Sequence, residues 1–166
     1  MKLSAKPASV EDILPWRDMY RLEMGCQIIH DSIHRRSGWT QEYFLHAGEV
    51  PVGYGSIAIA GPWKGKPTVY EFYVVPPYRS RVFDLFSALL TASGAVAIET
   101  QSNDALLTVM LHTFASNATS ESILFRHKFT TILSLPGTSF RTATAAEFPD
   151  VSPDQLQWHG VVENLW

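Results

Sequence analysis

Two arginines, Arg79 and Arg81, lie in a short polar segment between a predicted strand at residues 68–75 and a predicted helix at residues 81–92. A strand–turn–helix unit points backbone N–H groups and the positive end of the helix dipole at one place. Arginine guanidinium groups add charged hydrogen bonds to phosphate oxygens. The residue types and their spacing therefore predict a site for a phosphate or diphosphate group.

The same segment has features that oppose a diphosphate. Residues 76–84 contain no glycine, the residue whose missing Cβ would let the backbone approach a ligand closely. Val82 adds a branched side chain, and Asp84 places a carboxylate in the first helical turn, where it suits the helix dipole but repels a diphosphate. Two interpretations therefore stay open: an anion site that relies on Arg79 and Arg81, and a turn that binds no anion.

A histidine pair offers a second kind of chemistry. His30 and His34 are four residues apart and share one face of a helical run. This spacing can bind zinc, but Asp31 replaces the glutamate of the metalloprotease helix and no third ligand is marked by spacing. The single cysteine, Cys26, provides neither a disulfide nor a cysteine-based zinc site. We predict no metal site.

The hydrophobic pattern predicts the elements that position these residues. Helical spacing predicts helices at residues 13–33, 81–92 and 103–115, the first interrupted by Gly25. Runs rich in β-branched and aromatic residues predict strands at residues 3–6, 39–45, 50–60, 68–75, 95–99, 122–125 and 129–133. Three consecutive strands precede the central helix, so we predict an α+β fold with a mixed, mostly antiparallel sheet flanked by helices.

The turn also carries a family motif. It matches the start of Val-x-Pro-x-Tyr-Arg-Gly-x-Gly-x-Gly at Val74, Pro76, Tyr78 and Arg79. By this motif, and by the order of elements over residues 3–133, the chain resembles the GNAT superfamily of N-acetyltransferases. The motif is degenerate, because its three glycines are replaced by Ser80, Val82 and Asp84.

The resemblance implies a GNAT-like acyl-CoA N-acyltransferase fold and a bound acetyl-CoA or other acyl-CoA. The cofactor-binding residues that it implies are Val74, Val75, Arg79, Ser80, Arg81, Val82 and Asn103. Backbone N–H groups near Val74 and Val75 would stabilise the oxyanion that forms at the thioester carbonyl. Arg79 and Arg81 would hold phosphates, and Asn103 stands at the position of an asparagine of the family.

Glu71, in the strand before the turn, is implied as the catalytic general base. In this family a glutamate of that strand often takes the proton of the acceptor amine, directly or through water. Alternation along the strand predicts that Glu71 shares a face with Tyr73 and lies opposite Tyr70 and Phe72.

The general acid of the family is usually a tyrosine seven residues past the asparagine. That position is Met110 in this chain, and the helix has no tyrosine. His112, two residues further on, could donate a proton as imidazolium, and we take it as the candidate catalytic acid.

The acceptor is implied to be an amine of a small molecule or peptide. In GNAT-like proteins the loop between the first two helices helps to form the acceptor pocket, so His30, His34 and Trp39 are candidate substrate-binding residues. The function implied is therefore transfer of an acyl group from acyl-CoA to an amine. The alternative is a non-catalytic GNAT-like module, used for binding or dimerisation, that has lost normal acetyl-CoA binding.

The composition of the chain limits the classes of partner that we expect it to bind. Charged residues make up 17% of the chain and aromatic residues 12%, and a surface so poor in charge is consistent with a homodimer. The net charge of −3, with no basic run longer than residues 34–36, predicts no nucleic-acid partner. No apolar run approaches 18 residues, so we expect no membrane partner and a cytoplasmic location. We expect the GNAT-like domain at residues 1–135 and a C-terminal extension at residues 136–166, which could begin an incomplete second repeat.

Overall fold

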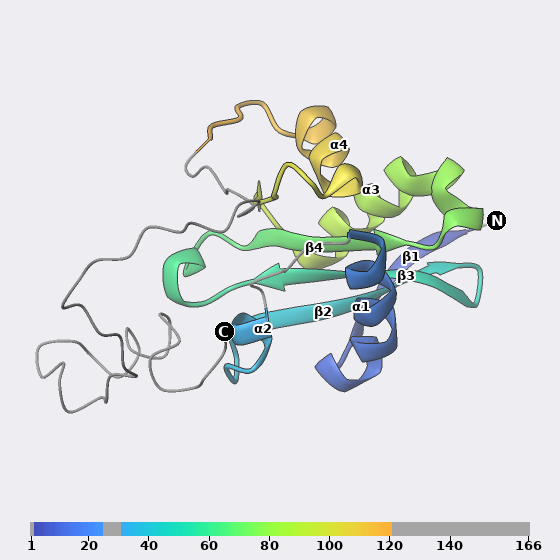
Figure 1. The fold of residues 1–166 in the computed structure, drawn as a ribbon, viewed down its shortest axis with the longest axis horizontal. Helices are drawn as coiled ribbons and strands as arrows, with labels where there is room; N and C mark the ends of the chain where they lie inside the picture. Colours follow the sequence, from blue (N-terminus) through green and yellow to red (C-terminus); the bar gives the residue numbers. More distant parts are fainter. Residues whose placement is uncertain (1, 25–30, 121–166) are drawn as a thin grey trace, which may run out of the picture. The chain divides into compact units, whose positions relative to one another are not determined.

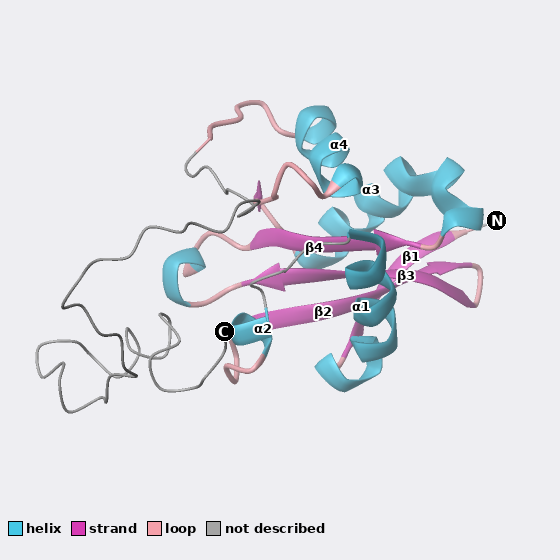
Figure 2. Ribbon diagram, viewed as in Figure 1, coloured by secondary structure: helices cyan, strands magenta, loops and turns pink. Residues whose placement is uncertain are grey.

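In the part of the chain that the structure describes, five strands form one sheet in the order β1-β2-β3-β4-β5 (Figure 1). The structure is a computed structural model that describes residues 2–24 and 31–120. Neighbouring strands are antiparallel from β1 (Leu3–Ala8) through β2 (Thr40–Ala47) and β3 (Val50–Ala58) to β4 (Thr68–Val74), and β5 (Ala97–Ile98) is parallel to β4. This mixed, mostly antiparallel sheet with helices beside it confirms the predicted α+β fold (Figure 2).

Within the described residues, four α-helices accompany the sheet. They are α1 (Val10–Met24), α2 (Asp31–His34), α3 (Val82–Ser93) and α4 (Ala105–Phe114). Ser9 and Asp12 cap the start of α1 reciprocally, since each side chain accepts a hydrogen bond from the backbone N–H of the other. The helical run predicted at residues 13–33 is thus two helices in the described part, and α1 ends directly before Gly25.

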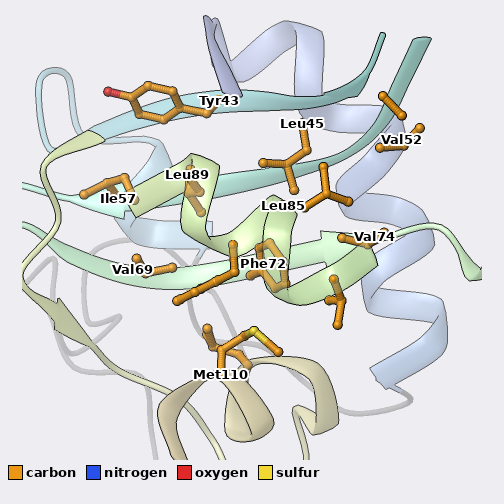
Figure 3. Close-up of a cluster of buried hydrophobic side chains, with 14 residues drawn as sticks. Tyr43, Leu45, Val52, Ile57, Val69, Phe72, Val74, Leu85, Leu89 and Met110 are labelled. Atoms are coloured by element: carbon orange, nitrogen blue, oxygen red, sulfur yellow. The ribbon is translucent and has the colours of Figure 1, made fainter. Parts of the chain in front are cut away.

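The two helical layers lie on opposite faces of the sheet (Figure 1). On one face α3 and α4 bury the main hydrophobic core, which includes Leu45, Val69, Phe72, Leu85, Leu89 and Met110 (Figure 3). On the other face α1 places Ile13 and Tyr20 against Tyr54 and Tyr73. Every described residue of β4 is buried because both of its faces are covered.

Two glycines explain how α3 is placed. A Cβ on Gly55 of β3 would lie only 2.4 Å from Leu89 Cδ2, so glycine is what allows α3 to pack this close to the sheet. At the other end, Gly94 has a φ of 67° and donates its N–H to Leu90 O at 2.9 Å, which ends α3. The strands predicted at residues 122–125 and 129–133, and the extension at residues 136–166, lie outside the described residues.

Candidate functional site

Among the described residues, no strand pairs with the second half of β4 on the side of β5, and we call this the open side of β4. β5 pairs only with Thr68 and Val69, whereas β4 continues to Val74. The N–H of Val75 is donated to Val52 O of β3 at 3.0 Å, so it is directed into the sheet. Because successive residues of a strand alternate the direction of their backbone groups, the N–H of Val74 faces the open side. Of the two predicted oxyanion donors, only Val74 thus faces that side.

A pocket of about 70 Å³ lies beside this open half of β4. Its wall is formed by β4, by the last turn of α1 and by the start of α4, through Tyr20, Glu23, Met24, Phe72, Tyr73, Asn103, Asp104, Ala105 and Leu106. Asn103, predicted from its position before the helix, is therefore a wall residue of this pocket. Most of the wall is apolar or aromatic, which suits a narrow and largely uncharged ligand group.

Helices α1 and α4, which lie on opposite faces of the sheet, are joined at the pocket. The hydroxyl of Tyr20 donates to Asp104 Oδ2 at 2.7 Å. The other oxygen of the same carboxylate accepts the N–H of Leu107 at 2.9 Å, which caps α4. Asp104 is only 3% exposed. One carboxylate thus starts α4 and ties it to α1 past the open side of β4.

Arg79 lies in the 3₁₀ turn that follows β4 (Pro76–Arg81). Its Nε donates to Val74 O at 3.0 Å, and its Nη2 forms an ion pair with Glu23 of α1. The guanidinium carbon also lies 5.9 Å from the centre of the Tyr73 ring. The first predicted phosphate ligand is therefore directed at the pocket wall and at α1.

The other residues of the turn are arranged differently. Arg81 pairs through Nε with Asp84 Oδ2 at 3.0 Å, and Ser80 is exposed. Asp84, which we expected to favour the helix start by its charge, thus lies against Arg81, and no side chain caps α3. Val82 is buried in the core under α3, so its branched side chain does not project from the turn, where we had expected it to obstruct a ligand.

Glu71 has no solvent exposure, and its carboxylate accepts hydrogen bonds from side chains of α1 and β3. Arg17 of α1 binds both carboxylate oxygens, with Nε to Oε2 at 2.9 Å and Nη2 to Oε1 at 2.8 Å. Tyr54 of β3 donates its hydroxyl to Oε2 at 2.9 Å. A bidentate guanidinium–carboxylate ion pair of this kind combines charge attraction with fixed geometry. The predicted general base therefore lies in a closed polar cluster beneath α1.

A β-bulge corrects the predicted alternation. Ser56 pairs with Glu71 and Ile57 pairs with Val69, so Tyr70 is an extra residue on β4. Tyr70 therefore points to the same face as Glu71, and both side chains contact His34. The prediction that Glu71 lies opposite Tyr70 was wrong for this reason. The predictions that it shares a face with Tyr73 and lies opposite Phe72 are confirmed.

His34 of α2 lies between two buried carboxylates. Its Nδ1 is 3.1 Å from Glu42 Oε1, and its Nε2 is 3.2 Å from Glu71 Oε2. The hydroxyl of Tyr70 is 2.8 Å from Nε2, and Ser56 donates to the second oxygen of Glu42. The closed polar cluster thus extends across β2, β3 and β4, and His34 is part of it instead of lining an open cleft.

Burial and neighbouring charges shift the pKa values of several groups in the cluster. Burial acts to lower the pKa of His34, but hydrogen bonds and attraction from Glu42 and Glu71 outweigh it and raise that pKa above its ordinary value. Burial likewise opposes the charge of Arg17, yet Glu71 raises the pKa of Arg17 further. Burial and the charge of Glu71 raise the pKa of Tyr54 well above its ordinary range, so its hydroxyl stays protonated. The carboxylates of Glu42 and Glu71 thus favour the charged form of His34.

The remaining predicted site residues lie apart from the pocket. His112 is exposed in the last turn of α4, six residues past Leu106, or about 9 Å along the helix axis. Trp39 is half-buried next to Ile33 and Trp63, and the Arg36 guanidinium carbon lies 4.4 Å from its ring centre. His30 lies outside the described residues. The structure therefore brings Asn103, Arg79 and the open side of β4 together, but not His112 or Trp39.

Sequence reasoning missed Arg17, Glu42 and Tyr54, and on the pocket side Tyr20, Glu23 and Asp104. Two signals were available. Arg17 shares a helical face with Ile13 and Tyr20 in an otherwise apolar stripe, and a charge on such a face requires a buried partner. Asp104 caps α4, and an aspartate at the start of a helical run is a local N-cap signal. The other four residues have no local signature, because their partners are distant in the sequence.

The described residues contain neither a metal-binding group nor a membrane-spanning helix. In residues 2–24 and 31–120, no three His, Cys, Asp or Glu side chains are grouped so as to hold a metal ion. Within the same residues no helix combines the length and the hydropathy needed to cross a bilayer.

No protein-family model and no curated protein matches this sequence, but solved structures resemble the fold. A ribosomal-protein-alanine N-acetyltransferase from Brucella melitensis is 11% identical and matches 76% of this chain and 100% of its own, with a TM-score of 0.51. An integron cassette protein from Vibrio cholerae is 10% identical over 78% and 94% of the two chains, with a TM-score of 0.50. A predicted acetyltransferase from Clostridium acetobutylicum, solved with acetyl-CoA, is 14% identical over 75% and 96%, with a TM-score of 0.48. The predicted resemblance is confirmed for the fold, and this chain has the fold of the GNAT N-acetyltransferases.

Proposed function

We propose that the protein is an acyl-CoA-dependent N-acyltransferase that acts on a primary amine. The observation that carries this proposal is the open side of β4. The strand runs on for five residues past its last pairing with β5, and a pocket lies beside that stretch. A sheet that separates at this point offers a narrow ligand both backbone donors and apolar walls.

The chain's residues fit the parts of an acyl-CoA. The apolar wall of the pocket, including Phe72 and Leu106, suits the thioester arm. The N–H of Val74 faces the same side, where it would donate to the thioester carbonyl oxygen as negative charge develops there. The turn with Arg79 follows directly and would take the phosphates.

Bound there, the acyl-CoA would supply the acyl group: the amine nitrogen forms the C–N bond, the C–S bond breaks, and the proton lost by the nitrogen is carried by water to the leaving thiolate, so that CoA leaves as the thiol. Glu71 was predicted to take the amine proton. Its carboxylate has no solvent exposure and is held by Arg17 and Tyr54, so we place it as a positioning residue that anchors β4. The proton of the amine would then leave to water at the pocket mouth. His112 stays a predicted acid without a contact to the pocket.

A pocket-filling substitution tests the proposal. Ala105 is exposed, is the first residue of α4 and lines the pocket, so Ala105→Phe fills the pocket without disturbing the core. We expect wild type to bind acetyl-CoA saturably in calorimetric titration. We expect Ala105→Phe to weaken that binding at least tenfold, or by about 1.4 kcal/mol. Ala92→Phe, at an exposed site near the end of α3, is the matched control and should bind as wild type does.

The same samples then serve for turnover. Release of free thiol from acetyl-CoA is followed against a panel of primary amines from small molecules and peptides. Saturable binding with amine-dependent thiol release supports the enzyme. No saturable binding of acetyl-CoA up to millimolar concentration would overturn the proposal, and equal binding by both phenylalanine variants would overturn only the placement of the arm.

A non-catalytic module is the second candidate, and one observation favours it. Both arginines of the turn are already paired with carboxylates, Arg79 with Glu23 and Arg81 with Asp84. A turn whose cations are so matched has less attraction for a phosphate. For this candidate we expect no acetyl-CoA binding in the titration above and a second copy of the chain or another protein as the partner.

A further inference from the structure

The last turn of α1 contacts both the start of α4 and the turn that follows β4. Tyr20 reaches Asp104 at the start of α4, and Glu23 reaches Arg79 in the turn after β4. Tyr20 and Glu23 also form part of the pocket wall. Because α1 lies on one face of the sheet, these two contacts bring a helix from that face to the open side of β4.

Glu23 and Arg79 form a long-range contact at a partly open place. The two residues are 56 positions apart in the sequence, and their side chains are 40% and 31% exposed. The pair that Arg81 makes with Asp84 is local, since those residues are three positions apart at the exposed start of α3. Glu23 is therefore the carboxylate that the fold brings to the pocket-side cation, and water or a ligand can reach the pair.

The guanidinium of Arg79 is shared among three neighbours. Its Nε donates a hydrogen bond to Val74 O and its Nη2 donates to Glu23. The guanidinium also lies near the Tyr73 ring. A carboxylate and a phosphate use the same donors of a guanidinium. A phosphate at this turn would therefore have to displace Glu23 or bind beside its negative charge.

We propose that Glu23 determines the affinity of the pocket for anionic ligands by competing for Arg79. This inference rests on the proposed function, in which the anion is the phosphate part of an acyl-CoA. The carboxylate of Glu23 acts in place of the ligand's phosphate while the pocket is without one. Neutralising the Glu23 carboxylate removes the group that competes for Arg79 and also its repulsion of a phosphate. Because the Glu23–Arg79 pair is partly exposed, we expect the two effects together to make phosphate binding about fivefold tighter.

The experiment compares Glu23→Gln with wild type, using three probes in calorimetric titration. CoA carries phosphates and the arm, pantetheine carries the arm alone, and inorganic pyrophosphate carries the charge alone. We expect Glu23→Gln to bind CoA and pyrophosphate about fivefold more tightly and pantetheine unchanged. Glu11→Gln is the matched control, because it removes one exposed carboxylate from the first turn of the same helix and should change none of the three.

The outcomes separate this inference from the proposed function. CoA bound equally well by wild type and Glu23→Gln would overturn the inference and leave the function standing. Tighter pyrophosphate binding with no saturable CoA binding in any variant would support the inference and overturn the function. Equal tightening for pantetheine would overturn the inference, because the effect would then be one of pocket shape. No binding of any probe would overturn both.

Glu23→Ala repeats the test with a side chain that cannot hydrogen-bond. Thermal unfolding of each variant is measured first, so that a folded sample is used throughout. Tightening in both Glu23 variants supports competition for the guanidinium. Tightening in the glutamine variant alone would overturn it, because a new amide contact would then be the cause.

Discussion

At the scale of single residues, the buried pair of Arg17 and Glu71 governs how β4 is held. Removing two charges from water is costly, and the cost is met only where geometry is good and the remaining polar atoms are satisfied. Here the guanidinium binds both oxygens of the carboxylate, and Tyr54 supplies one further hydrogen bond. The pair is therefore sensitive to loss of either partner, since the other would remain as a buried, unmatched charge.

We expect Glu71→Gln to lower the free energy of unfolding by about 3–5 kcal/mol, because it leaves Arg17 charged and unmatched in the interior. Urea unfolding at constant pH measures the loss. Glu49→Gln is the matched control: the Glu49 side chain is 93% exposed and lies 3.4 Å from Lys6 Nζ, so its loss should stay within about 0.5 kcal/mol. A loss below about 1 kcal/mol for Glu71→Gln would contradict the role of the pair as an anchor.

At the scale of elements, Asp104 links two helices that do not share a face of the sheet. It caps α4 through Leu107 and accepts the hydroxyl of Tyr20 from α1. The sequence predicts α4 within two residues at each end, because apolar residues at helical spacing are a local feature. The link to Tyr20 is not local, since the two residues are 84 positions apart, and no pattern in either segment indicates the other.

We expect Asp104→Ala to cost about 2–4 kcal/mol, the sum of a lost helix cap and a lost hydrogen bond of a buried tyrosine. Ser9→Ala, which removes the exposed capping side chain of α1, should cost only about 1 kcal/mol and is the control. Tyr20→Phe completes a double-mutant cycle, and we expect a coupling of about 0.5–3 kcal/mol with Asp104→Ala. Additive losses in urea unfolding would mean that the link contributes nothing.

At the scale of the whole molecule, the order of strands and helices over residues 3–115 follows from local hydrophobic spacing and from turn residues. The turn that carries the family motif also lies where the motif predicts it, between β4 and α3. The contacts within the candidate site do not follow in the same way. Glu71 lies in a closed cluster because Arg17, Glu42 and His34 converge on it from other elements, and periodicity along one segment carries no information about such convergence.

The charge balance of that cluster makes global stability depend on pH. The folded pKa of His34 is raised, so the folded state binds its proton more tightly than the unfolded state does. This contribution is fully present below the ordinary pKa of 6.5 and is lost as the pH rises through the higher folded pKa. We therefore expect the free energy of unfolding to fall with rising pH above about 6.5, by at most about 1.4 kcal/mol per pH unit.

Urea unfolding at a series of pH values tests this dependence. The groups that face His34 are Glu42 from β2 and Tyr70 and Glu71 from β4, and Arg17 from α1 contacts Glu71. His34→Gln should abolish the decline, whereas His112→Gln, at an exposed site on α4, should leave it intact. A decline that survives in His34→Gln would place its origin at another group.

The extra residue in β4 has a consequence for how this chain tolerates change. Tyr70 shifts the strand by one position, so the residues before and after it follow opposite inward and outward phases. Deletion of Tyr70 alone would restore plain alternation and leave Val69 and Phe72 on the α3 face and Glu71 on the α1 face. It would remove only the second β4 side chain that contacts His34. Deletion of Phe72 would instead turn part of the strand over, so the bulge is the place where β4 can lose a residue and keep its layers.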